Sequence, residues 1–332
     1  MMPRILLAMS LVATLHAQSL PLVIAHRGAS GYLPEHTLPA KALAHALGAD
    51  FLEQDLVLTR DNVPVVLHDI HIDTISDVAR RHPDRHRSDG RFYAIDFTLE
   101  ELKQLRLSER FVAKTGRAVF PHRFPVGSGE FRIVTLEEEL TFIQGLNHST
   151  SRTAGVYPEL KQPAWHRAQG RDLAAVVLPV LEKFGYGDSS APCYLQCFEY
   201  REVQRIRRDL GWKGRMILLI EADSKGEDGT DYDAVCRPEG LKELARWVNG
   251  IGPSLSRVLS WSPAGGVKAS PLTSDAHAAG LLVHPYTVRR DELPKGCGSL
   301  DALHQALFQE ARVDGVFTDF PDLTRAWLQQ HR

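Results

Sequence analysis

Short apolar runs typical of β-strands alternate eight times with helix-like segments along this chain. The strand-like runs cover residues 22–25, 51–57, 155–159, 194–198, 216–220, 249–252, 281–286 and 315–318. The helix-like segments cover residues 37–47, 136–146, 173–184, 202–210, 241–248, 274–279, 300–311 and 323–330. Such alternation predicts the α/β class, and eight repeats predict a closed (β/α)8 TIM barrel of parallel strands. A chain of 332 residues suits one such domain, at residues 18–332.

One stretch, residues 70–132, interrupts this alternation. It is rich in turn residues, carries a basic run that ends at Arg87, and contains one helix-like segment at residues 99–107. Connections of this length in a compact domain usually have structure or a function of their own. We therefore predict a small insertion subdomain after the second strand, over the mouth of the barrel.

The first residues have the pattern of a secretory signal peptide. Arg4 precedes an uncharged run at residues 5–15, and His16-Ala17-Gln18 follows as a cleavage region. We predict a signal peptide at residues 1–17, export across the inner membrane and a periplasmic location; a buried N-terminal helix is the alternative. No later stretch reaches the roughly 18–20 apolar residues that span a bilayer, so no stable membrane insertion is expected.

Charge and cysteine content exclude some other classes of protein. The formal net charge of −2 gives no indication of a nucleic-acid partner. The four cysteines, Cys193, Cys197, Cys236 and Cys297, fit no zinc spacing, although export leaves open a disulfide to Cys236 or Cys297. The sequence leaves the oligomeric state open.

Polar residues gather where several predicted strands end. In barrel enzymes the reactive groups lie at the carboxyl ends of the strands, so these positions carry the most information about function. The candidate residues are His26 and Arg27 on the first strand, Glu53 and Asp55 on the second, His68 on the hairpin arm that follows, and Glu159 and Lys161 on the third.

Three of these residues form a candidate metal site. Side chains two apart on a strand share a face, so Glu53 and Asp55 point together, and Glu159 should meet them inside the barrel. Three converging carboxylates repel one another unless a cation lies among them. Oxygen ligands favour one hard divalent cation, with Ca²⁺ expected ahead of Mg²⁺ and both ahead of zinc. A solvated edge strand is the alternative, but the neighbouring residues of the second strand are apolar.

Charge balance then indicates the substrate. With the three carboxylates and a divalent cation in place, Arg27 and Lys161 leave one net positive charge, which a phosphodiester would neutralise. Salt bridges from Arg27 and Lys161 to the same carboxylates are the alternative. His26 and His68 are the side chains here that exchange protons near neutral pH, so they are candidate acid and base, although most of the 15 histidines must be structural.

Several motifs together resemble a known family. IAHRGASGYLPEHTLPAKAL is followed by GADFLEQDLVLTRDNVPVVLHD, YPELK, YLQCFE, LLVHPYT and GVFTDFP. This set resembles the glycerophosphodiester phosphodiesterase family, in particular its periplasmic bacterial branch, over residues 23–321. The resemblance implies a TIM barrel with an insertion after the second strand. It also implies hydrolysis of glycerophosphodiesters, such as glycerophosphocholine and glycerophosphoethanolamine, to sn-glycerol 3-phosphate and an alcohol.

The resemblance also implies a role for each candidate residue. His26 and His68 correspond to the acid–base pair, Glu53, Asp55 and Glu159 to the metal ligands, and Arg27 and Lys161 to the phosphate-binding residues. Family members are thought to use a glycerol hydroxyl as the nucleophile and then to open a cyclic phosphate with water. Gln196, Phe198 and Tyr286 correspond to residues that line the pocket, although packing explains Phe198 equally well.

Two residues depart from the family pattern. Many relatives have Asn at the position of His36 and Asp at the position of Glu199. Neither position belongs to the metal or proton-transfer set, so both bear on substrate preference. Two other functions remain open from the sequence: a barrel phospholipase that acts on intact lipid, and a secreted binding protein that has lost catalysis.

Overall fold

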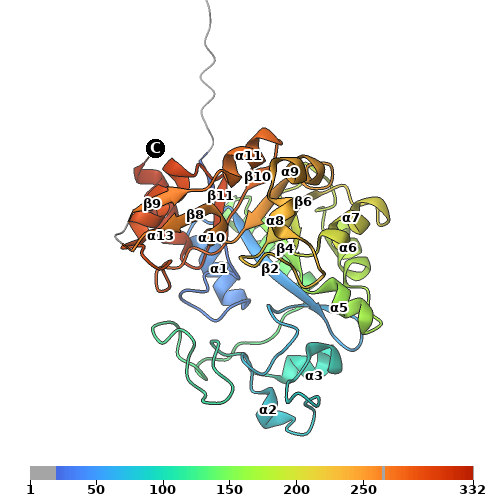
Figure 1. Cartoon of the computed structure of the whole chain (residues 1–332). Helices are drawn as coiled ribbons and strands as arrows, with labels where there is room; N and C mark the ends of the chain where they lie inside the picture. The colour runs from blue at the N-terminus through green and yellow to red at the C-terminus, as the bar shows by residue number, and fades with distance from the viewer. Residues whose placement is uncertain (1–19, 264–265, 332) are drawn as a thin grey trace, which may run out of the picture.

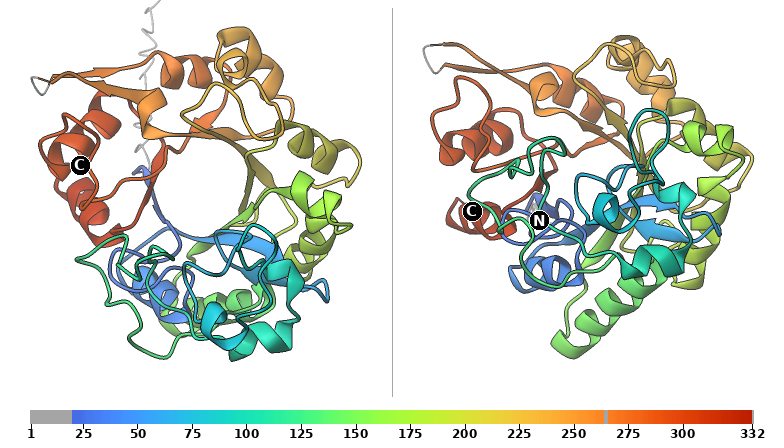
Figure 2. Two further views of the ribbon diagram at one scale, coloured as in Figure 1. Left: turned by 60° about the horizontal axis from the view of Figure 1, so that its bottom comes forward. Right: turned by 90° about the horizontal axis from the view of Figure 1, so that it is seen from below.

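Eight parallel strands form the core of the computed structural model, which describes residues 20–263 and 266–331 (Figure 1). The segment predicted as a signal peptide, residues 1–17, lies outside the described residues. In spatial order the strands are β10 (Leu282–Val283), β7 (Gly250–Pro253), β6 (Arg215–Ile220), β5 (Tyr194–Cys197), β4 (Gly155–Leu160), β2 (Phe51–Leu58), β1 (Leu22–Ala25) and β11 (Gly315–Thr318). Seen along its axis, this sheet curls into a ring (Figure 2), which confirms the predicted barrel.

The ring closes between β10 and β11 through irregular backbone contacts. Asp314 donates its N–H to the carbonyl of Val283 at 3.0 Å, and Phe317 donates to Pro285 at 3.0 Å. Val288 in turn donates to Phe317 at 2.8 Å. Pro285 has no N–H to donate, which explains why the regular ladder stops early at this seam. The strand predicted at 281–286 is therefore regular only at Leu282–Val283.

Helices cover the outside of the ring (Figures 1 and 2). The main ones are α1 (Leu38–Ala46), α4 (Leu136–Thr150), α6 (Leu173–Lys183), α7 (Tyr200–Arg208), α9 (Pro238–Leu244), α11 (Leu272–Ala278), α12 (Leu300–Gln305) with its π-helical continuation η2 (Ala306–Glu310), and α13 (Pro321–Gln330). The helices α9 and α13 start earlier than the sequence analysis predicted. Each begins with a proline, a residue that suits the first helical turn. Within the described residues no helix is both long and apolar enough to cross a membrane.

The structure adds several short elements that the sequence analysis missed. They are the helices α5 (Pro163–Ala168), α8 (Tyr232–Val235) and α10 (Leu255–Val258), and the antiparallel pair β8 (Leu259–Trp261) and β9 (Val267–Ala269). The four cysteines are all free, so the disulfide left open above is absent from the structure.

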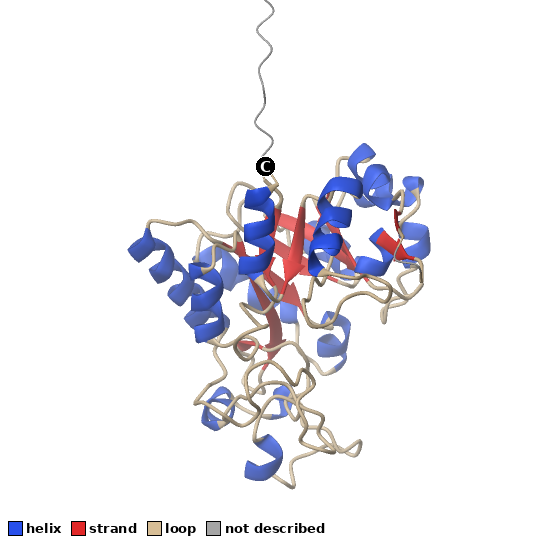
Figure 3. Ribbon diagram, turned by 90° about the vertical axis from the view of Figure 1, so that its left-hand side faces the viewer, coloured by secondary structure: helices blue, strands red, loops and turns tan. Residues whose placement is uncertain are grey.

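The segment between β2 and α4 extends from the carboxyl end of the barrel (Figure 3). It starts with β3 (Pro64–Val66), which pairs antiparallel with β2, and continues through α2 (Val78–Arg81), η1 (Ala94–Asp96) and α3 (Leu99–Gln104). A second hydrophobic cluster holds it together, with members from Val57 to Ile133. Thr98 forms a capping box that starts α3, but the helix ends at Gln104, before the predicted residue 107.

Period-two alternation along the strands builds the barrel interior in layers. One buried layer consists of Ile24, Phe51, Tyr157, Tyr194, Ile217 and Phe317. Two residues further along the same strands lie His26, Glu53, Glu159, Gln196, Leu219 and Asp319. Because side chains two apart share a face, the second layer also points inward, nearer the carboxyl ends. An apolar and aromatic layer thus lies beneath a layer that is polar except for Leu219.

Gly155, at the start of β4, offers a test of this close packing. A Cβ there would lie 2.4 Å from the Phe51 ring and 2.6 Å from the Pro192 carbonyl oxygen. We expect Gly155→Ala to lower the free energy of unfolding by about 1–3 kcal/mol through overpacking. Gly145→Ala in α4, where a Cβ meets nothing within 4 Å, is the control and should raise it by roughly 0.5–1 kcal/mol. Urea denaturation measures both, and equal effects would contradict the packing argument.

Candidate active site

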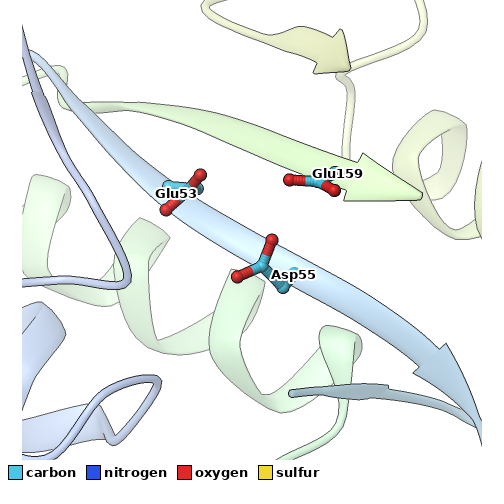
Figure 4. Close-up of side chains that lie close together, drawn as sticks. All are labelled: Glu53, Asp55 and Glu159. Carbon is cyan, nitrogen blue, oxygen red and sulfur yellow. The ribbon is translucent and has the colours of Figure 1, made fainter. Parts of the chain in front are cut away.

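Three carboxylates meet inside the barrel on β2 and β4 (Figure 4). Glu53 and Asp55 lie two residues apart on β2, and Glu159 on β4 is the register partner of Asp55. Their exposed fractions are 3%, 1% and 4%, respectively. Each offers an oxygen atom that lies within 4.8 Å of the oxygens offered by the other two. The structure therefore brings the predicted trio together.

The trio is electrostatically unbalanced. Burial raises the pKa of Glu53 well above its ordinary value, and the charges of Asp55 and Glu159 raise it further. Burial and Asp55 raise the pKa of Glu159 to about 8, against the opposing effect of Lys161. Burial would also raise the pKa of Asp55, but the Lys161 ammonium and the His36 imidazole hold it well below its usual range. Three ionised carboxylates therefore need an additional positive charge at this site.

The residues fit a hard divalent cation. Oδ1 of Asp55 is buried and has no hydrogen-bond partner among the described residues, and its nearest cationic neighbour, Nζ of Lys161, is 3.9 Å away. A buried carboxylate oxygen without a hydrogen bond destabilises the folded protein unless another group or an ion binds it. All three available donors are carboxylate oxygens, the ligand type that Ca²⁺ and Mg²⁺ prefer. This arrangement is a possible acidic metal site.

A buried ion pair supports β2 on the face that points away from the barrel interior. Nζ of Lys41 on α1 lies 2.8 Å from Glu139 on α4 and donates to the main-chain carbonyl of Glu53. Glu139 also accepts from the side-chain amide of Gln54 at 3.0 Å. Lys41, Glu139 and Gln54 are fully buried. Lys41 and Glu139 of the two helices, together with Gln54 of β2, thus hold in place the strand that presents Glu53 and Asp55 to the interior.

Arg27 and Lys161 lie beside the carboxylates and pair with them. Nζ of Lys161 is 2.7 Å from Glu159. The Arg27 main-chain N–H donates to Glu53 at 2.7 Å, its Nε lies 3.6 Å from Asp55, and its Nη1 donates to Glu35 at 2.8 Å. The salt bridges that the sequence analysis kept as an alternative are therefore present, and both residues also line a cavity over the site.

The charge sum made from the sequence was incomplete. Glu35 adds a negative charge next to Arg27, and Arg110 of the inserted segment adds a positive one. Nη2 of Arg110 donates to Glu35 at 2.6 Å. These two charges compensate each other, so the net balance of the site is unchanged. Arg27 nevertheless shares its charge with more carboxylates than the sequence indicated.

His26 forms a buried dyad with Asp319, the residue that follows β11. Nδ1 of His26 lies 2.6 Å from Oδ1 of Asp319. The other Asp319 oxygen accepts from Arg123 at 2.7 Å and from Arg289 at 2.9 Å. An ionised carboxylate can only accept, so Nδ1 carries the proton and Nε2 keeps its lone pair. Nε2 is 4.0 Å from Glu53 and so faces the carboxylate trio.

His68 forms a second dyad of the same design. Its Nδ1 lies 2.6 Å from Oδ1 of Asp69, and Oδ2 of Asp69 accepts from Arg110 at 2.6 Å. Burial lowers the pKa of His68 to about 3, and the charges of Arg27 and Lys161 add to the effect. Burial and Arg27 lower the pKa of His26 to about 4. Both imidazoles are therefore neutral at neutral pH, with one ring nitrogen free toward the cavity.

The remaining predicted pocket residues also lie in this region. Nε2 of Gln196 donates to Glu53 at 3.1 Å. The rings of Phe198 and Tyr286 pack edge to face, with centroids 5.8 Å apart. Two adjoining cavities, of about 310 and 260 Å³, open over the site. They share His68, Glu159, Lys161, Phe198 and Tyr286 in their walls.

The two departures from the family pattern have different surroundings. Nε2 of His36 lies 2.7 Å from Oδ2 of Asp55, so His36 touches the acidic trio, which the sequence analysis did not foresee. His36 has φ +59°, a left-handed conformation in which Asn and His are enriched. Glu199 instead lies in the wall of the larger cavity, where it accepts from the backbone N–H of Ala164 at 3.0 Å.

Sequence reasoning missed the partners that orient the histidines. They are Asp69, Asp319, Glu35, Arg110 and Arg123. A signal existed for two of them, since Asp69 directly follows His68 and Asp319 follows the last strand in the GVFTDFP motif. Arg110 and Arg123 lie in a loop region with no periodic pattern, and nothing in their spacing indicated that they reach the barrel.

Comparison with known proteins agrees with this geometry. Residues 26–323 match the model of the glycerophosphoryl diester phosphodiesterase family. The chain is 41% identical over 329 residues to a glycerophosphodiester phosphodiesterase of Haemophilus influenzae, with 94% of this chain and 90% of that protein covered. It is 39% identical to a glycerophosphodiester phosphodiesterase of Treponema pallidum, with 91% and 90% covered.

A solved structure shares the fold. It is an Oleispira antarctica phosphodiesterase in complex with the product sn-glycerol-3-phosphate, 22% identical, with a TM-score of 0.63 and with 93% of this chain and 97% of that chain covered. At this identity the likeness concerns the fold alone. The family match spans most of the chain, and both relatives exceed 35% identity over nearly their whole length. The chain therefore belongs to the glycerophosphoryl diester phosphodiesterase family and is a phosphoric diester hydrolase.

Proposed function

We propose that the protein hydrolyses glycerophosphodiesters, such as glycerophosphocholine and glycerophosphoethanolamine, to sn-glycerol 3-phosphate and an alcohol, with one divalent cation and two histidines. The observation that carries this proposal is the buried trio of Glu53, Asp55 and Glu159 near two histidine–aspartate dyads. One Asp55 oxygen of this trio has no hydrogen bond within the described part of the chain. Both named relatives are glycerophosphodiester phosphodiesterases, which supports the substrate class.

Glu53, Asp55 and Glu159 would hold the cation, Ca²⁺ ahead of Mg²⁺. When bound, such an ion balances the three carboxylates and polarises a phosphoryl oxygen. Lys161 and Arg27 line the smaller cavity next to this trio and would bind the remaining phosphoryl oxygens. Since both already pair with carboxylates, their orientation is set before the diester arrives, and little side-chain freedom is lost on binding.

His26 and His68 would move the protons. Each presents Nε2 while its Nδ1–H is held by an aspartate, the arrangement that sets the tautomer of a general base. One imidazole would accept the proton of the attacking hydroxyl at its Nε2. The other would donate a proton from its Nε2 to the leaving alkoxide, and it would carry that proton once the phosphodiester anion is bound, because a nearby negative charge favours the imidazolium form. Asp69 and Asp319 are positioning residues, because they act through the histidines.

The alternative of a phospholipase that acts on intact lipid has less support. Such an enzyme needs an apolar rim that contacts the bilayer. In the described part of the chain, the exposed large hydrophobic side chains are Val112 and Val119, both in the inserted segment. Two valines offer little apolar area compared with the polar cavities over the site.

Metal dependence can be tested by chelation and replacement. We expect EDTA to lower the rate of glycerol 3-phosphate release by more than about a hundredfold, because metal polarisation is worth several kcal/mol. Added Ca²⁺ or Mg²⁺ should restore activity to the wild type but not to Glu53→Gln. Glu137→Gln is the control: Glu137 lies exposed on α4, where it pairs with Lys183 of α6, and this variant should behave as the wild type. Full activity of a protein shown to be metal-free would refute the metal site.

The acid–base assignment can be tested with single histidine variants. His26→Ala and His68→Ala should each lower kcat by about 10²- to 10⁴-fold, the usual contribution of a positioned acid or base. His148→Ala, at an exposed position near the end of α4, is the control and should keep full activity. Circular dichroism checks that each variant is folded. A folded double variant of His26 and His68 with wild-type activity would end the assignment.

We further propose export to the periplasm, on the basis of the basic, apolar and cleavage regions at residues 1–17. The mature protein should then begin at Gln18. Sequencing the N-terminus of the protein recovered from the periplasmic fraction tests this. Recovery of the intact chain, with Met1 or Met2 retained, in the cytoplasmic fraction alone would refute export.

A further inference from the structure

The guanidinium of Arg110 binds two carboxylates that belong to different parts of the site. Its Nη2 and Nε donate to the two oxygens of Glu35, at 2.6 and 3.2 Å. Its Nη1 donates to Oδ2 of Asp69 at 2.6 Å. A planar guanidinium has several donors in fixed directions, so it can hold two carboxylates at once. Arg110 therefore fixes the position of Glu35 relative to Asp69.

Each of the two carboxylates in turn holds a residue with a proposed role in the reaction. Oε2 of Glu35, which accepts from Nε of Arg110, also accepts from Nη1 of Arg27 at 2.8 Å. Oδ1 of Asp69 lies 2.6 Å from Nδ1 of His68. A continuous chain of hydrogen bonds thus runs from Arg27, which would bind the phosphate, to His68, which would transfer a proton. Arg110 is the middle member of this chain.

The ion pairs of this chain are largely shielded from solvent. The side chains of Arg110, Glu35 and Asp69 are 18%, 11% and 28% exposed, respectively. Burial would raise the pKa of Glu35, but the charges of Arg110 and Arg27 hold it well below its ordinary value. Burial would also raise the pKa of Asp69, but its bond to His68 and the charge of Arg110 lower it. Both carboxylates are therefore ionised, and hydrogen bonds between charged groups are stronger than neutral ones.

The backbone at Arg110 is held by the inserted segment itself. The carbonyl of Arg110 accepts from the N–H of Val119 at 3.0 Å, and the next residue, Phe111, donates its N–H to the carbonyl of Thr74 at 2.9 Å. The Thr74 hydroxyl also lies 3.4 Å from Nη1 of Arg110. Because the backbone is paired on both sides, the fold of the insertion sets the place of this guanidinium.

Arg110 lies outside the space that a substrate would fill. Among the described residues, those that line the two cavities over the site include His68 and Arg27, but neither Arg110 nor Glu35. A bound diester would therefore touch the two ends of the hydrogen-bonded chain and not its middle. Arg110 can act on the reaction only through its partners.

The loss of Arg110 would release both ends of the chain. Glu35 would be free to turn, and the side chain of Arg27 would be drawn toward Asp55, whose Oδ2 lies 3.6 Å from its Nε. Asp69 would be free to move with the ring of His68. A displacement of about 1 Å at groups of this kind can lower a rate by about a hundredfold.

We propose that Arg110 is a positioning residue that couples the phosphate-binding residue Arg27 to the proton-transfer residue His68. The proposal rests on the proposed diester hydrolysis and adds to it the residue that holds these two groups in fixed relative positions. It follows that one change in the inserted segment, outside both cavities, alters phosphate binding and proton transfer together.

Arg110→Gln tests the coupling through two separate measurements on metal-loaded protein. One is kcat for glycerophosphocholine, and the other is the Kd of sn-glycerol 3-phosphate from isothermal titration calorimetry. We expect kcat to fall by about ten- to a hundredfold and Kd to rise by about three- to tenfold, because Arg27 is no longer held by a fixed carboxylate. Arg117→Gln, the same change at an exposed position of the inserted segment, is the matched control and should keep both wild-type values.

Variants of the two carboxylates should separate what Arg110 combines. Glu35→Gln should raise Kd and lower kcat far less than Arg110→Gln does, since Glu35 binds Arg27. Asp69→Asn should lower kcat and leave Kd nearly unchanged, since Asp69 binds His68. A partly unfolded preparation would lower kcat and the number of binding sites but not change the Kd of the folded fraction. A change of both values in Arg110→Gln is therefore not the result of lost stability alone.

The outcomes separate this proposal from the proposed function. If the wild type and Arg117→Gln release no glycerol 3-phosphate, the proposed function fails and the coupling fails with it. If both are active and Arg110→Gln matches them in either kcat or Kd, the coupling alone is overturned. Should circular dichroism show that Arg110→Gln is unfolded, Arg110→Lys takes its place. Its ammonium keeps the charge but not the fork that holds both carboxylates, so at least one value should change by about threefold or more; two wild-type values would overturn the proposal.

Discussion

The mutual repulsion of three buried carboxylates is the constraint on which the site depends. Glu53, Asp55 and Glu159 are almost fully buried above an apolar and aromatic layer of the barrel, so water screens their charges only weakly. The surrounding structure compensates with fixed positive groups, chiefly Lys161 and Arg27. One Asp55 oxygen still lacks a hydrogen-bond partner among the described residues. The negative charge of the three carboxylates is thus only partly balanced by the protein, and a divalent cation would balance the rest.

The inserted segment contributes to the site as well as covering it. Arg110 binds Asp69, the partner of His68, and Arg123 binds Asp319, the partner of His26. Each histidine is therefore oriented through an aspartate whose second oxygen is held by an arginine of the insertion. Hydrogen bonds of this kind set the tautomer and limit the rotation of both rings. A hydrophobic cluster of its own holds the inserted segment together and so supports the two arginines.

Much of this could be predicted from the sequence, because strand periodicity is a local property. The two-residue period of a strand predicted that Glu53 and Asp55 share a face. The predicted ends of the strands indicated His26, His68 and Lys161 as site residues. The barrel and the centre of the site could therefore be predicted from spacing. The predicted starts of α9 and α13 were wrong, because the apolar periodicity begins later than the proline at the first turn of each helix. Spacing carries no information about contacts between irregular segments far apart in the chain. The partners Arg110, Arg123 and Asp319 were therefore decided by the tertiary structure alone, since only the closed barrel and its folded insertion bring these side chains to the histidine–aspartate dyads.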